Sequence, residues 1–189
     1  MRRILTMTLT IALAVAGASA AAAQDTEPGA DEASDVDDMP MVEAPAPPAE
    51  GTAIATIGDT TWEFVLDGDA RVQCNPDFGG FFFAVLFGQD EDGQETVLSI
   101  QADPAGTRAG VQIGLTTIPG ALWIADPNVY ISFPDLEEGV GATVTIDGAS
   151  ATGTGVFYDD RSLQEARQTG GAYEAGLMPG SFAVTCPAL

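Results

Sequence analysis

Residues 79–100, GGFFFAVLFGQDEDGQETVLSI, place two strongly apolar runs on either side of four carboxylates. Aromatic and β-branched residues are typical of strands. The dipeptide Asp92-Gly93 between the two runs is the strongest short signal for a two-residue hairpin turn. The stretch therefore predicts an antiparallel β-hairpin.

The predicted turn also sets the pairing of the two strands. With a type I′ turn at Asp92-Gly93, Phe87 faces Leu98 and Val85 faces Ile100. Because side chains alternate between the two faces of a strand, one face of the first strand is then buried, namely Phe81, Phe83, Val85 and Phe87.

The acidic residues of the hairpin have two interpretations. In the predicted register Asp90 lies opposite Glu95, and such a like-charge pair destabilises a hairpin unless a cation bridges it. Asp90, Asp92 and Glu95 are therefore candidate cation ligands. Gly93 directly follows Asp92. A calcium-binding EF-hand loop instead has its glycine at the sixth position of the loop and a bidentate acid at the twelfth. We interpret the acids as a soluble turn and expect neither a bound metal nor a cofactor.

The rest of the sequence also predicts strands. Short runs with period-two alternation recur between Gly, Pro and Asp turns, and only residues 161–168, RSLQEARQ, predict a helix. Many short strands at regular spacing are typical of β-sandwiches and barrels. We expect an all-β fold, an antiparallel β-sandwich or a partly closed barrel, with one short helix near the C-terminus.

The two cysteines of the chain are Cys74 and Cys186. An even count in an oxidising compartment implies one disulfide, which here ties an early strand to the last one. Closing so long a loop stabilises a fold by about 4–5 kcal/mol on the chain-entropy account. The alternative is a nucleophilic thiol, but the chain has no histidine to activate it.

The N-terminal part predicts export. Residues 1–23 combine two arginines, an apolar run and a small-residue cleavage site, so they predict a signal peptide cut before Ala21 or Gln24. Residues 24–50 are acidic and rich in Pro and Ala, and they predict a disordered linker. Residues 51–189 have the size of a single domain. We therefore expect a periplasmic or secreted protein without a transmembrane segment.

The charge of the chain limits its partners. From Gln24 onward it holds 28 carboxylates against four arginines, a formal net charge of −24, with no lysine and no histidine. Nucleic acid is therefore excluded as a partner, because phosphates require a basic face. We expect an unknown protein or glycan of the cell envelope as the partner.

The missing residue types also limit the chemistry. Histidine-dependent nucleophiles and imidazole zinc sites are excluded, as are Schiff-base and phosphate-loop lysines. Acid catalysis by a pair of carboxylates remains, with Asp159, Asp160, Glu137 and Glu138 as candidates. Adjacent acids on a strand point to opposite faces, and the first two precede residues 161–168, where they cap the expected helix. We expect no catalytic residue.

A second hairpin, ALWIADPNVYISF at residues 121–133, offers a candidate ligand platform. A four-residue loop at 125–128 pairs Trp123 with Tyr130 on a face of small residues. Two such rings stack well against a sugar or an apolar side chain. The alternative is a cross-strand aromatic pair that only stabilises the sheet. The opposite face, with Leu122 and Ile124, is then the core face.

The two ends of the domain resemble a known family. GTAIATIGDTTWEFVLDGDARVQC (residues 51–74) is similar to the opening of the mycobacterial nineteen-kilodalton lipoprotein antigen family. ATVTIDGASATGTGVFYDD (142–160) and GSFAVTC (180–186) resemble its ending. The resemblance implies a small disulfide-tied β-rich domain displayed in the cell envelope, without an established catalytic activity. The chain lacks the lipidated cysteine of that family.

These observations favour an exported, non-enzymatic binding or structural protein of the envelope. The first alternative is a glycan hydrolase that uses carboxylates alone, and the second is a calcium-dependent adhesion or binding module.

Overall fold

A computed structural model describes residues 40–116, 121–127, 140–171, 173 and 176–188. The chain divides into two units, Met1–Glu32 and Ala33–Leu189, and every described residue belongs to the second. In chain order its elements are β1 (Thr52–Ile57), β2 (Thr60–Val65), α1 (Ala70–Gln73), β3 (Cys74–Asn75), β4 (Phe82–Gln89), β5 (Glu95–Ala102), β6 (Ala109–Leu115), β7 (Ala121–Ala125), β8 (Gly141–Asp147), β9 (Ser150–Asp159), α3 (Asp160–Thr169) and β10 (Met178–Thr185).

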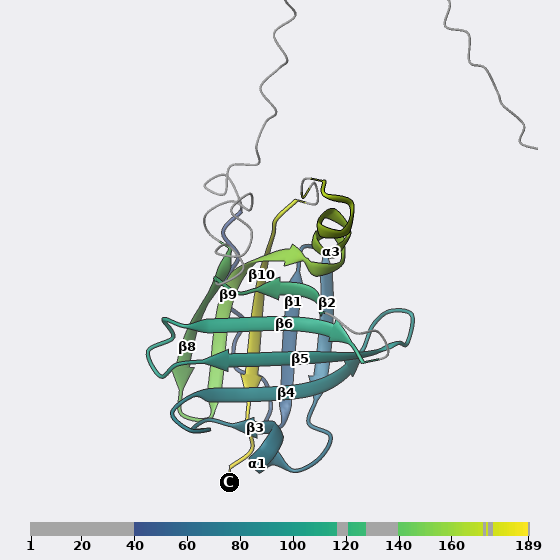
Figure 1. Cartoon of the computed structure of the whole chain (residues 1–189). Coiled ribbons are helices and arrows are strands. Elements are labelled where there is room, and N and C mark those ends of the chain that lie inside the picture. Colours follow the sequence, from purple (N-terminus) through teal and green to yellow (C-terminus); the bar gives the residue numbers. More distant parts are fainter. Residues whose placement is uncertain (1–39, 117–120, 128–139, 172, 174–175, 189) are drawn as a thin grey trace, which may run out of the picture. The chain divides into compact units, whose positions relative to one another are not determined.

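Eight antiparallel strands close into a barrel (Figure 1). The ring runs β1, β2, β4, β5, β6, β7, β9 and β10, and β10 closes it by pairing with both β9 and β1. Two further strands lie beside the ring, because β8 pairs with β9 and the short β3 pairs with β4. The predicted all-β antiparallel fold is confirmed, in the form of a closed barrel.

The β4–β5 hairpin forms, but its register differs by one residue from the prediction. Leu86 lies opposite Leu98, and Ala84 lies opposite Ile100. The buried face of β4 is therefore the one that holds Phe82, Ala84 and Leu86. The predicted buried face was wrong, since a shift of one residue moves every side chain to the opposite face of its strand. The outward-facing residues of β4 are Phe83, Val85 and Phe87, and Phe81, directly before the strand, is also exposed.

The β4–β5 turn explains this shift. Five residues, 90–94, connect the strands where two were expected. Within the turn, Oδ1 of Asp90 accepts hydrogen bonds from the backbone N–H groups of Asp92 at 3.0 Å and Gln94 at 2.7 Å. Gly93 has a φ of +75°, a conformation that glycine adopts without a steric cost. An Asx-type turn of odd length thus replaces the type I′ turn.

The barrel interior is one continuous apolar core. It includes Phe64, Phe82, Phe157 and Phe182, each no more than 1% exposed, together with the aliphatic residues of β5 and β6. The predicted disulfide between Cys74 and Cys186 is confirmed, with 5.2 Å between the two Cα atoms. Both cysteines are fully buried in the same core, so the bond ties β3 to the segment just after β10.

The predicted helix near the C-terminus is confirmed as α3. Asp159 is its N-cap, and its Oδ1 accepts a hydrogen bond from the N–H of Arg161 at 2.9 Å. Leu163 of α3 packs with Val140 and Tyr158 in a second, smaller apolar cluster. Within the described residues, no helix has the length and apolar character needed to cross a membrane.

Residues 40–50, the end of the expected linker, lie against the barrel. Val42, Pro45 and Pro48 are half-buried, whereas the other residues of this segment are exposed. This spacing of three matches the three residues per turn of a polyproline II helix. Residues 40–42 line a hollow of about 300 Å³ together with the adjoining parts of β8, β9 and β10. The start of this segment therefore lies beside β8, β9 and β10.

The register of β4 can be tested by a pair of adjacent substitutions. Leu86→Ala should lower the free energy of unfolding by about 2–5 kcal/mol, because it opens a cavity in the core. Val85→Ala should lower it by about 1 kcal/mol or less, because this side chain lies on the outer face. Urea denaturation of the two variants measures the difference, and equal losses would contradict the observed register.

The disulfide can be tested by removing both cysteines. Cys74→Ala with Cys186→Ala should lower the free energy of unfolding by about 4–5 kcal/mol, because the unfolded chain regains the entropy of a long loop. Adding a reductant to the wild-type protein should give a similar loss in urea denaturation and leave the double variant unchanged. A double variant as stable as the oxidised protein would contradict this role.

Candidate functional site

The outer face of β4 carries an apolar row that the barrel core does not use. We call Phe81, Phe83, Val85 and Phe87 the β4 strip. Phe81 is 37% exposed and the other three are half-buried. None of the four belongs to the main core or to the partly buried residues packed against it. The strip therefore presents apolar side chains outward.

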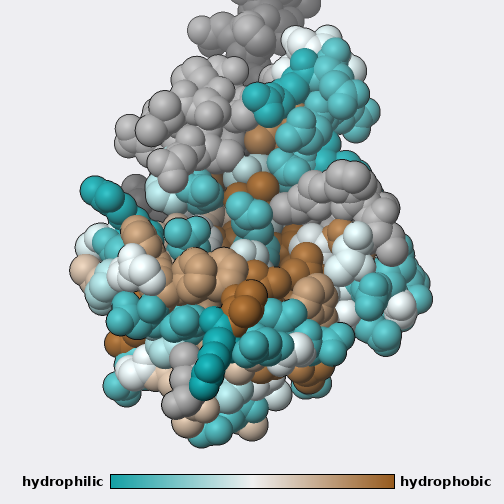
Figure 2. Space-filling model, turned by 60° about the horizontal axis from the view of Figure 1, so that its bottom comes forward, coloured by the Kyte–Doolittle hydropathy of each residue, from teal (hydrophilic) through white to brown (hydrophobic). Residues whose placement is uncertain are grey.

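Neighbouring residues enlarge this apolar surface. The ring of Phe78 packs on Phe83 with 5.4 Å between the ring centroids, and Phe78 is itself 53% exposed. Val65 on β2 lies opposite Phe87 and is 56% exposed. Figure 2 shows apolar side chains gathered across the middle of this side of the molecule, between hydrophilic groups. Such a contiguous apolar patch on the surface of a folded domain is typical of an interaction surface.

The outer face becomes polar from β4 to β6. Across the sheet, Phe83 is followed by Gln101 and Gly110, and Val85 is followed by Ser99 and Gln112. An apolar strip beside a polar region is the usual composition of a recognition surface, with an apolar centre and a polar rim.

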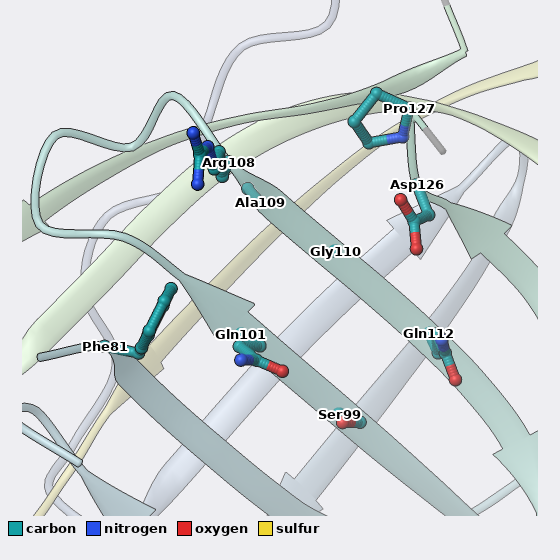
Figure 3. Close-up of a pocket in the computed structure, with 9 residues that line it drawn as sticks. All are labelled: Phe81, Ser99, Gln101, Arg108, Ala109, Gly110, Gln112, Asp126 and Pro127. Carbon is teal, nitrogen blue, oxygen red and sulfur yellow. The ribbon is translucent and has the colours of Figure 1, made fainter. Parts of the chain in front are cut away.

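A polar hollow of about 360 Å³ lies over this part of the sheet (Figure 3). Phe81 of the β4 strip lines one side of it, and Pro127 lines another. Gly110 adds no side chain to the hollow, and a Cβ there would make only an ordinary contact, 3.8 Å from Oδ2 of Asp126. Its lining residues are Phe81, Ser99, Gln101, Arg108, Ala109, Gly110, Gln112, Asp126 and Pro127.

The β5–β6 turn holds Arg108 at this hollow. Oδ1 of Asp103 accepts hydrogen bonds from the N–H of Thr107 at 2.7 Å and of Arg108 at 3.1 Å, and its Oδ2 accepts one from the Thr107 hydroxyl at 2.7 Å. These bonds lower the pKa of Asp103, and the bond from the Thr107 hydroxyl has the largest effect. Its carboxylate is therefore retained to lower pH than an ordinary one, and its stabilisation of the turn is lost only as the pH falls through this lowered pKa.

The hollow is lined by several groups that form hydrogen bonds. Amide, hydroxyl, guanidinium and carboxylate groups provide both donors and acceptors for a polar ligand. The one hydroxyl among them, that of Ser99, has no histidine or lysine to activate it, because the chain contains neither. The arrangement fits recognition of a ligand surface.

The predicted cation ligands do not come together. Gln89, and not Asp90, lies opposite Glu95. One oxygen of Asp90 is occupied by the two backbone bonds of the turn, and Oε2 of Glu95 accepts a hydrogen bond from the Thr116 hydroxyl at 3.0 Å. In the described ranges, no three Asp, Glu, Cys or His residues are grouped so that they could hold a metal ion.

The candidate acids of the hydrolase alternative lie at the start of α3. Asp159 caps the helix, and its Oδ2 also accepts a hydrogen bond from the Ser162 hydroxyl at 2.9 Å. Asp160 is 9% exposed and lies in the first turn of the helix, where a negative charge is favourable. Glu137 and Glu138 lie outside the described residues.

The predicted aromatic platform is described only in part. Trp123 is half-buried and packs against the main core, opposite the buried Ile113. Ile124, which we expected on the core face, packs with the second cluster beside Tyr158. Tyr130 lies outside the described residues.

Two tyrosines near α3 have altered acidity. Burial is the main cause that raises the pKa of Tyr158, followed by the negative charge of Asp160. Burial also raises the pKa of Tyr173, whose hydroxyl accepts a hydrogen bond from the N–H of Asp159 at 3.0 Å. Both phenols therefore stay neutral at physiological pH and serve the packing of α3.

Sequence reasoning missed the β4 strip because it placed the same residues inside. A signal for the strip was nonetheless present in the run Phe81-Phe82-Phe83, which is apolar at consecutive positions. In an antiparallel strand with one solvated face, apolar and polar residues should alternate. Consecutive phenylalanines therefore place apolar side chains on both faces of the strand.

Comparison of the chain with models of known protein families, with curated proteins and with solved structures finds no match. The resemblance of its two ends to the mycobacterial lipoprotein antigen family therefore stays a prediction.

The acidic turn can be tested with calcium. Adding millimolar Ca²⁺ should raise the melting temperature no more than the same concentration of Mg²⁺ does, because Asp90 and Glu95 are already hydrogen-bonded within the fold. A thermal-shift series with both ions and a chelator measures the effect. A rise specific to Ca²⁺ that Asp92→Asn abolishes would show a cation site in the hairpin.

Proposed function

We propose that this protein is an exported, non-enzymatic binding protein of the cell envelope, and that it recognises its partner with the outer face of β4 to β6. The observation that carries the proposal is the β4 strip. It provides three outward apolar residues on β4, whose opposite face already supplies the core, and a fourth, Phe81, directly before the strand.

The energetics of the strip support a binding role. Full burial of an exposed Phe or Val side chain contributes about 1.5–3 kcal/mol, and each partly exposed residue of the strip can add a part of this to a complex. The polar hollow adjoins the strip at Phe81 and adds groups that can orient a partner by hydrogen bonds.

Two further observations support export to an oxidising compartment. The N-terminal sequence has the pattern of a signal peptide, and the buried disulfide is a bond that persists mainly outside the cytosol. The absence of histidine and lysine from the sequence supports a role without catalysis, as does the use of Asp159 to cap a helix.

The proposal can be tested by co-sedimentation of the mature protein with envelope fractions from the cells that produce it. Phe81→Gln with Val85→Thr should reduce the bound fraction, with an affinity loss of about tenfold or more, equivalent to about 1.4 kcal/mol. Both side chains lie on the outer face, so the melting temperature should change little.

The matched control is Val72→Gln on α1. Val72 is also exposed, at 63%, but lies outside the strip. Its variant should sediment like the wild-type protein. Equal binding of all three proteins would overturn the proposed recognition surface.

A further inference from the structure

A groove opens where β2 and the β4–β5 hairpin separate. The two strands are paired at two positions only, Phe64 with Gly88 and Val65 with Phe87. Beyond these positions the start of β2 passes beside the hairpin turn, and a groove of about 660 Å³ lies between them. Its walls are the outward residues of β2 and the end of the hairpin.

The centre of this groove is apolar. Val65 and Phe87 face outward there, and Leu66 beside them is half-buried. Gly88 lets β2 and β4 approach closely at this point, because a Cβ at this position would collide with the carbonyl oxygen of Glu63. Since Phe87 is also the last residue of the β4 strip, the groove continues the apolar surface.

The rim of the groove is strongly acidic. Five carboxylates line it, and the other lining residues are uncharged: the acids are Glu63, Asp67, Asp90, Glu91 and Glu95. Within the described part of the chain, the side chains of Glu63, Asp67 and Glu91 make no hydrogen bond or ion pair. These three negative charges therefore remain available to a partner.

We infer that this groove binds a basic, amphipathic segment of a partner protein. Apolar side chains of that segment pack on Val65 and Phe87, while its Lys or Arg side chains pair with the carboxylates of the rim. The inference rests on the proposed function, because it names the partner chemistry for one end of the same surface.

The apolar centre and the acidic rim together favour a basic amphipathic segment over other ligands. A bare metal ion would gain nothing from Val65 and Phe87, and an acidic segment would be repelled by the rim. A neutral apolar segment would leave the carboxylates without counter-charges. A cationic amphipathic segment satisfies both parts of the groove, and the net charge of the chain accelerates its approach.

The inference can be tested with a fluorescent synthetic peptide in which lysine and leucine alternate. The mature wild-type protein should bind it, as measured by fluorescence anisotropy, and added salt should weaken the binding. A peptide with glutamate in place of lysine should not bind. Equal binding of the two peptides, or no binding of the lysine peptide, would overturn the inference.

Charge-neutralising variants test the location of binding. Glu63→Gln with Glu91→Gln should raise the Kd for the lysine peptide about tenfold or more. The matched control is Asp147→Asn with Glu165→Gln, which removes the same charge from exposed positions on β8 and α3. This control should change the Kd no more than about twofold. If both pairs of substitutions raise the Kd equally, the peptide is attracted by net charge alone. That result would overturn the groove as the binding site.

The apolar centre of the groove, Val65 and Phe87, is tested by Val65→Thr, which keeps the shape of the side chain. This substitution should raise the Kd for the lysine peptide several-fold without changing its salt dependence. An unchanged Kd would show that the apolar centre does not contribute to binding. If the peptide fails to bind but envelope binding still depends on Phe81 and Val85, only the inference falls. If envelope binding does not depend on them, the proposed function falls.

Discussion

Asp90 accepts two backbone hydrogen bonds inside the β4–β5 turn, and the odd length of that turn decides which phenylalanines are buried. With five connecting residues, Phe82 and Leu86 enter the core. The β4 strip then faces outward and lines the polar hollow at one end and the acidic groove at the other. A turn with one residue fewer would exchange the two faces. The interaction surface is therefore a consequence of the turn geometry.

The two apolar clusters stabilise different parts of the fold. The main cluster fills the barrel and includes the disulfide, whereas the second holds α3 against the end of β9. Neither cluster includes the β4 strip. Substitutions on the strip should therefore affect binding without a large loss of stability, which makes binding and folding separable in experiments on this protein.

The sequence was sufficient for features that local chemistry determines. Period-two alternation predicted the strands, two cysteines predicted the disulfide, and Asp159 before a short helical pattern predicted a capped helix. The face of β4 was not predictable in the same way, because Phe81 to Phe87 are apolar on both faces and pattern alone cannot choose between them. The choice depended on hydrogen bonds of the Asp90 side chain, for which Asp92-Gly93 gave a misleading signal.

The position of β10 in the ring has a consequence for the order of events during synthesis. Among the described strands β10 comes last, and it pairs with β1, which comes first, and with β9. Before Met178–Thr185 have been synthesised and have emerged, the sheet is therefore open and has two unpaired edges. The chain also lacks the second cysteine at this stage. Exposed edges can pair with other chains. Until Met178–Thr185 emerge, β1 and β9 therefore each keep an edge with which another strand can pair.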